Sequence, residues 1–111
     1  MSAVKIEDWR LVFVFDPDIA DHDVIKYILI SGLVRKHPVL CPKGSELDVP
    51  VETSVVETFQ GTTLTTANTV YKLGRPSSEY LALLSNQHLV WNAKRPIPDC
   101  FLPGHEVRVA A

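Results

Sequence analysis

The sequence is poor in the residues that build metal centres, phosphate-binding loops and disulfide frameworks. Its 111 residues include two cysteines and five glycines. Cys41 and Cys100 lie far apart and follow no CxxC spacing, so we expect free thiols in a reducing cytoplasm. A single disulfide between them is the alternative. The scattered glycines supply no phosphate-binding loop, and no HxxxH or CxxC spacing is present, so we expect neither a cofactor nor a metal ion.

Long apolar runs and an excess of one charge are missing too. The longest apolar stretch, residues 24–34, is interrupted by Lys26, Ser31 and Gly32. It is shorter than the roughly 18 residues of a membrane span. The first eight residues carry acids and no apolar core, which is not the pattern of a secretion signal. With a net charge of −2, we expect a cytoplasmic protein without membrane insertion or general affinity for nucleic acid.

The composition that remains is that of an ordinary globular chain. Hydrophobic residues make up 46% and charged residues 22%, which argues against wholesale disorder. A chain of this length suits one core, because two would each be marginal. We therefore predict a single domain over residues 1–111.

Most of the chain has β patterning. The run 11–15 is uninterrupted apolar sequence, typical of a strand buried on both faces. Alternation over 51–60, a turn at Gly61-Thr62 and the segments 63–66 and 69–73 predict a meander of three strands. A last edge strand is expected at 106–109, and a short one at 39–40.

Two helices are predicted beside these strands. Over 21–35, the residues Ile25, Ile28, Leu29, Gly32 and Leu33 follow helical spacing, and the acids at 16, 18, 21 and 23 suit its N-terminus. A short helix over 78–86 is capped by Ser77 and buries Leu81 and Leu84. Residues 88–91 fit either a helix or a strand. We thus predict an α+β fold: a four- or five-stranded, mostly antiparallel sheet with the 21–35 helix packed on one face.

One part of the chain resembles a known group of proteins. Val51-Glu52-Thr53-Ser54 and the later Thr65-Thr66-Ala67-Asn68-Thr69-Val70-Tyr71-Lys72-Leu73-Gly74 resemble a V-x-T-S … T-x-N-T-x-Y-x-L-G strand pattern. This pattern is found in small uncharacterised proteins of proteobacteria and their phages. The resemblance covers residues 51–74 only. It implies a bacterial or phage origin and carries no activity.

Catalysis has one weak candidate. Cys100 follows Asp99, and a histidine from elsewhere in the chain could complete a Cys/His/Asp arrangement. No glycine-rich elbow or oxyanion signature surrounds either cysteine, so we assign no catalytic residue. The acids at 16–23 resemble a calcium loop only faintly, because the required Gly and terminal Glu are missing.

A binding role fits the residues better. The threonine-rich strands 63–66 and 69–73 offer a hydroxyl-bearing face that could dock a partner, although good β-formers on a solvent face are the simpler explanation of these threonines. Aromatic side chains with polar neighbours are typical interface anchors. The predicted partner-binding residues are Thr63, Thr65, Asn68, Tyr71, Trp9 and Trp91. We predict a non-enzymatic module that binds a protein or itself, such as a phage or mobile-element inhibitor or adaptor of a host protein. A small enzyme around Cys100 and a small-molecule-binding module are the alternatives.

Overall fold

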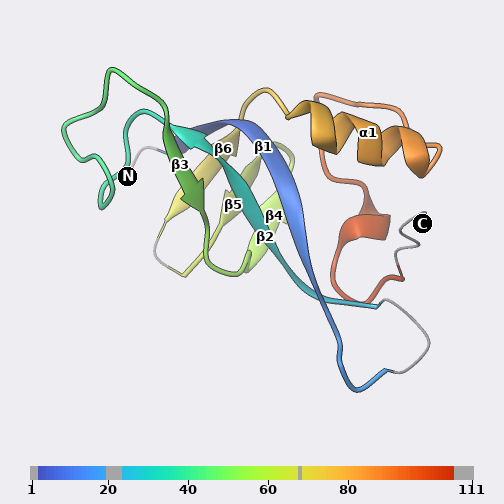
Figure 1. Ribbon diagram of the computed structural model, residues 1–111. Helices are drawn as coiled ribbons and strands as arrows, with labels where there is room; N and C mark the ends of the chain where they lie inside the picture. Colours follow the sequence, from blue (N-terminus) through green and yellow to red (C-terminus); the bar gives the residue numbers. More distant parts are fainter. Residues whose placement is uncertain (1–2, 20–23, 68, 107–111) are drawn as a thin grey trace.

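The fold is a mixed six-stranded sheet with one α-helix and one 3₁₀-helix, which confirms the α+β class (Figure 1). The computed structural model describes residues 3–19, 24–67 and 69–106. The elements are β1 (Val4–Phe15), β2 (Ile25–Val34), β3 (Val49–Glu52), β4 (Thr58–Gln60), β5 (Thr63–Thr65), β6 (Val70–Leu73), α1 (Ser78–Asn86) and η1 (Asp99–Phe101). The strand order is β3-β2-β1-β6-β5-β4, so the sheet is larger than the predicted four or five strands. Four pairings are antiparallel, and β1 and β6 are parallel.

The prediction of a central helix over 21–35 is wrong. Residues 25–34 form strand β2, which pairs antiparallel with β1. Seven of the ten residues in this run are apolar, so its pattern fits a period of two as well as a helical period. Ile28 and Ile30 point inward and are buried, while Tyr27 and Leu29 alternate with them and are half-buried. The segment forms a strand because pairing with the long β1 gives the backbone N–H and C=O groups of β2 hydrogen-bond partners along its length.

Asp16 and Asp18 belong to a turn after β1 instead of a helix N-terminus. The Asp18 amide donates a hydrogen bond to Asp16 Oδ1 at 3.0 Å, an Asx-type turn that ends β1. Residues 21–23, which include the other predicted capping acids, lie outside the described residues. The predicted strand 11–15 is confirmed, and it extends back to Val4.

The last two strands of the predicted meander are confirmed, but the first predicted strand, 51–60, is two separate strands in the structure. Residues 51–60 contribute to two strands, β3 and β4, separated by 53–57. The intervening segment still follows β2, because Thr53 N donates to Ile30 O at 2.8 Å and Val56 N to Ile28 O at 3.0 Å. The Gly61-Thr62 turn, β5 and β6 lie where predicted.

Three smaller predictions have mixed outcomes. Residues 39–40 form a turn and not a strand. Residues 88–91 are neither helix nor strand. Glu106 forms an isolated antiparallel bridge with Val24, and the rest of the predicted last strand lies outside the described residues.

The short helix is confirmed with its cap. Ser77 Oγ accepts a hydrogen bond from Tyr80 N at 3.2 Å, which satisfies one of the free amides of the first turn. Tyr80 and Leu84 are buried, whereas Leu81 is 41% exposed, so the prediction that Leu81 is buried is wrong. In the described part of the chain, no helix is both long and apolar enough to cross a bilayer.

The helix and the 3₁₀-helix cover the inner face of the long hairpin, and Figure 1 shows both on the same side of it. The inner side chains of β1 meet them directly. The Trp9 and Tyr80 rings are 4.5 Å apart between centroids, and the Phe13 and Phe101 rings are 5.6 Å apart. The Trp9 indole also donates to Gly74 O at 3.0 Å. Trp9 and Tyr80 are therefore the fully buried centre of an aromatic cluster whose outer members, such as Phe13, are half-buried.

A bulge in β1 allows this packing. Between Glu7 and Arg10 the register shifts against Leu33 and Ser31, so that two residues of β1 oppose Gly32 alone. Asp8 adopts a φ of 50° there. A Cβ on Gly32 would lie 2.8 Å from Ile6 Cγ1 and 2.9 Å from Glu7 O. Glycine is required at this position because the two strands approach too closely for a side chain.

Candidate binding groove and outer sheet face

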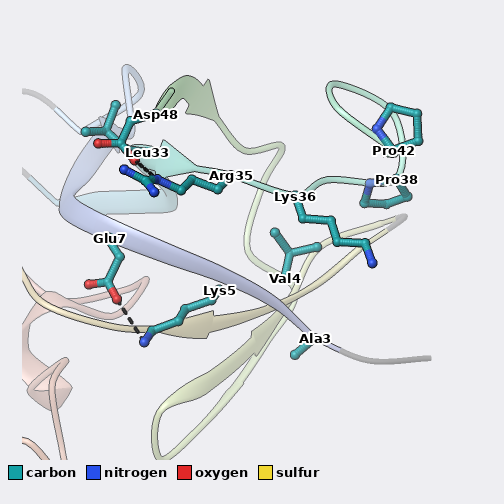
Figure 2. Close-up of a pocket in the computed structure, with 10 residues that line it drawn as sticks. All are labelled: Ala3, Val4, Lys5, Glu7, Leu33, Arg35, Lys36, Pro38, Pro42 and Asp48. Carbon is teal, nitrogen blue, oxygen red and sulfur yellow. Dashed lines mark hydrogen bonds and ion pairs between the residues drawn. The ribbon is translucent and has the colours of Figure 1, made fainter. Parts of the chain in front are cut away.

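A groove of about 790 Å³ lies between the start of β1 and the chain that follows β2. Figure 2 shows its lining residues. The apolar part of the lining consists of Ala3, Val4, Leu33, Pro38 and Pro42. Two of these are prolines, whose rings hold the backbone φ in place. The volume is within the range of small-molecule pockets.

The rest of the lining is charged. Lys5 Nζ lies 3.1 Å from Glu7 Oε1, and Arg35 Nε lies 2.9 Å from Asp48 Oδ1. Lys36 is the fifth charged residue, and among the described residues it makes no ion pair. Three cations and two carboxylates leave the lining with a net charge of +1. Since every one of these side chains is on the surface, each ion pair contributes little to stability.

The groove wall is held in shape by a buried histidine. His37 Nδ1 faces the amides of Val39 and Leu40 at 3.1 and 3.2 Å, so it accepts both hydrogen bonds. The other ring nitrogen, Nε2, lies 2.9 Å from the Tyr71 hydroxyl. A neutral ring that accepts at Nδ1 carries its proton on Nε2 and donates to Tyr71. His37 thus joins the loop that carries Pro38 and Pro42 to strand β6.

Burial affects the titration of both partners. It lowers the pKa of His37 from its ordinary 6.5 and raises the pKa of Tyr71. Both changes favour the neutral pair, because desolvation disfavours a charged ring. For Glu7 the charged form is favoured instead. Burial alone would raise its pKa, but the hydrogen bond from the Arg75 amide and the nearby Lys5 outweigh burial, so the pKa is lowered.

A second feature is the outer face of the long hairpin. Its side chains alternate with the buried ones, and four of them form two directly opposed pairs, Val12 with Leu29 and Val14 with Tyr27. All four are half-buried. We call Val12, Val14, Tyr27 and Leu29 the apolar ladder. It lies on the opposite side of the sheet from the residues that meet α1 and η1.

The six predicted partner-binding residues do not share one surface. Thr63 and Thr65 are half-buried on β5, two residues apart and so on one face. Tyr71 pairs with Leu64 on the other face and is 3% exposed. Trp9 is fully buried, and Trp91 is half-buried with its ring 6.2 Å from that of Trp9. Asn68 lies outside the described residues.

The cysteines do not form a nucleophilic centre with the described side chains. Cys41 is half-buried, Cys100 is exposed, and both are free thiols. Asp99 pairs with Arg95 at 2.6 Å, and no histidine ring within residues 24–67 or 69–106 hydrogen-bonds to either thiol. His22 lies outside the described residues. Among the described residues, no three His, Cys, Asp or Glu side chains gather as metal ligands.

Sequence reasoning missed both the groove and the ladder. The groove residues come from 3–7 and 33–48, and only the strand register brings these segments together. A helix over 21–35 would place Leu29 and Tyr27 on helix faces instead of opposite Val12 and Val14. The signal in the sequence is the uninterrupted apolar run 11–15, whose outer residues Val12 and Val14 are apolar like its inner ones.

Comparison with protein-family models, curated proteins and solved structures found no match to this chain.

Proposed function

We propose that this chain is a non-enzymatic protein-interaction module that joins a second copy of itself through the outer face of the β1–β2 hairpin. The observation that carries the proposal is the apolar ladder in the middle of the two longest strands. A sheet face that stays in water normally carries polar side chains. Opposed apolar pairs on such a face indicate a surface that another protein covers.

The other half of the same face supplies the contrast. Lys5 of β1 pairs with Lys72 of β6, which places both on the outer side. Beyond them, Thr63 opposes both Lys72 and Gln60, and Thr65 opposes Thr58. Apart from Val70, which opposes Thr65 on the same face, these residues are polar, as expected for a solvent face. The apolar residues are therefore concentrated over β1 and β2 and are not a general property of the sheet.

The charges at the end of the ladder favour a second copy as the occupant. Arg10 pairs with Ser31 of β2, and Ser31 pairs with Glu52 of β3. The row thus carries a cation on one side of β2 and an anion on the other. Arg10 Nε also lies 3.5 Å from Glu79 Oε2 of α1, but an exposed pair of this length is weak, so Arg10 can exchange Glu79 for a carboxylate of a second copy. When two copies meet face to face about an axis along β2, each Arg10 lies opposite Glu52 of the partner subunit. An isologous interface of this kind is self-complementary in charge.

The area of the face predicts a weak dimer. The two long strands, β1 and β2, are about ten residues long and about 4.8 Å apart, so they present a strip of roughly 300 Å². Stable complexes bury about 800 Å² per partner. The association should therefore be reversible and depend on protein concentration.

Light scattering after size-exclusion chromatography tests the proposal over a range of concentrations. The wild-type chain should shift from monomer to dimer as its concentration rises, and Leu29→Lys should stay monomeric. Thr63→Lys, on the polar half of the same face, is the matched control and should dimerise like the wild type. A wild-type chain that is monomeric at every concentration would overturn the proposal.

Charge reversal tests the orientation of the two copies. Arg10→Glu and Glu52→Arg should each weaken the dimer, because each brings two like charges together. The double variant should restore it. If the double variant is weaker than either single one, the copies do not meet about an axis along β2.

A more specific proposal is that the chain is a phage or mobile-element inhibitor or adaptor of a host protein. It rests on the resemblance of residues 51–74 to proteins of proteobacteria and their phages. A host protein that binds the ladder would compete with the second copy, so its binding should be lost in Leu29→Lys and kept in Thr63→Lys.

A further inference from the structure

The groove between β1 and the loop after β2 points to a second binding activity, which does not depend on self-association. We propose that it binds a small molecule with an apolar body and one carboxylate group. The walls Val4, Leu33, Pro38 and Pro42 would contact the apolar body. Lys36 would bind the carboxylate.

The charges of the lining favour an anionic ligand over a cationic one. Lys5 and Arg35 already have carboxylate partners in Glu7 and Asp48. An amine would have to displace one of these cations before it met a free carboxylate. A carboxylate can bind Lys36 without breaking either pair, because Lys36 makes no ion pair within the described part of the chain. The excess positive charge of the lining therefore favours an anion.

The groove is formed before the ligand arrives. The wall between Pro38 and Pro42 is closed by two backbone hydrogen bonds between His37 and Cys41, with N–O distances of 3.2 and 3.1 Å. The His37 ring adds the bonds to Val39, Leu40 and Tyr71. A wall held by five hydrogen bonds loses little conformational entropy on binding. This rigidity distinguishes the groove from an ordinary gap between surface side chains.

Octanoate, 1-octanol and octylamine are suitable probes, because they share the apolar chain and differ in the head group. Titration followed by amide chemical shifts in NMR gives both the affinity and the location. We expect octanoate to bind most tightly and to shift the amides of Val4, Leu33 and Lys36. Shifts confined to the apolar ladder, or octylamine binding as tightly as octanoate, would overturn the proposal.

Two substitutions in the lining should have opposite effects. Lys36→Met should weaken octanoate binding about threefold, the scale of one exposed ion pair. Asp48→Asn should strengthen it by a similar factor, because it removes a negative charge and frees Arg35. A gain in affinity cannot come from partial unfolding. Lys94→Met, at an exposed position away from the groove, is the matched control and should change nothing. Equal affinities for the wild type, Lys36→Met and Asp48→Asn would refute the role of charge.

All titrations are repeated in the Leu29→Lys background, which keeps the chain monomeric if the proposed dimer exists. Octanoate binding should persist there. Loss of binding in Leu29→Lys would show that the groove needs the second copy, and would overturn the independence of the two sites.

Discussion

At the residue scale, His37 is a buried polar side chain held by several hydrogen bonds. It is 6% exposed and has hydrogen-bond partners on both ring nitrogens. Protonation would place an N–H on Nδ1 facing the two amides that now donate to it. The neutral ring is therefore part of the folded structure. Tyr71 is the titratable group that contacts the ring, and its raised pKa keeps it neutral as well.

This arrangement predicts a dependence of stability on pH. The pKa of His37 is below 6.5 in the folded chain, so the unfolded chain binds more protons between the two values. The free energy of unfolding should be at its full value above pH 6.5 and should decrease as the pH falls through the folded pKa. Urea unfolding at a series of pH values measures this decrease.

The variant His37→Gln should lose this dependence, because no group titrates at the position. His105→Gln, at an exposed histidine, is the control and should keep it. Glu7 does not confuse the result, because its pKa is lowered from 4.5 and its effect belongs to a more acidic range. If the wild type and His37→Gln lose stability in parallel near pH 6, His37 does not control the pH response.

The groove illustrates what residue patterns can and cannot show. The cations Arg35 and Lys36 are adjacent in the sequence. Pro38 and Pro42 follow within six residues. Their relation to Val4 and Lys5 was not visible, because it depends on the pairing of β1 with β2 and of β3 with β2. Long-range register brings the site together, and no local spacing encodes it.

At the scale of elements, the helix α1 has a cap that the sequence identified correctly. Ser77→Ala should lower the free energy of unfolding by about 1 kcal/mol, since it leaves the Tyr80 amide without its acceptor. Ser78→Ala, one residue later and exposed, is the control and should cost less. Denaturant titration followed by circular dichroism compares the two. Equal costs would mean that the hydroxyl of Ser77 does not contribute through capping.

The bulge in β1 provides a second test at this scale. Gly32→Ala should destabilise the chain by about 1–3 kcal/mol, because the new methyl group meets a backbone oxygen that cannot move away cheaply. Ser31→Ala, on the neighbouring position of β2, should change stability much less. The same unfolding experiment gives both values. A neutral Gly32→Ala would show that the bulge adjusts freely.

The contrast between α1 and β2 explains why one helix prediction was right and the other wrong. The helix over 78–86 is favoured by local sequence features: a serine cap, an acid in the first turn and residues that do not branch at Cβ. The 24–34 segment is rich in isoleucine and valine, which favour strands. Its helical spacing arose from an excess of apolar residues. Where both periods fit, the partner strand decides, and the partner is ten or more residues away.

At the scale of the whole molecule, β1 joins two groups of buried side chains. Towards β4–β6 the core includes Leu64 and Tyr71, and beneath α1 it includes Leu84 and Trp9. Leu64→Ala and Leu84→Ala should each cost about 2–5 kcal/mol, the usual range for buried leucines. Because both groups depend on β1, both variants should still unfold in one transition.

Tryptophan fluorescence and far-ultraviolet circular dichroism test this coupling. Trp9 and Trp91 both lie beside Tyr80 of α1 and report on this region, whereas circular dichroism reports on the whole backbone. The two transitions should coincide in the wild type and in both variants. If fluorescence is lost before the circular dichroism signal in Leu84→Ala alone, the region beneath α1 unfolds separately.

The parallel pairing of β1 with β6 has a consequence for the chain as it is being made. Val4 pairs with Tyr71 and Ile6 with Leu73, so the parallel partner of β1 is synthesised more than sixty residues after β1 itself. During that interval the hairpin of β1 and β2 can form, but one edge of β1 stays open, with its hydrogen-bonding groups unpaired. Contacts between residues so far apart in the sequence also form slowly. The nascent chain should therefore be most vulnerable to aggregation and most dependent on chaperones just before residues 70–73 emerge.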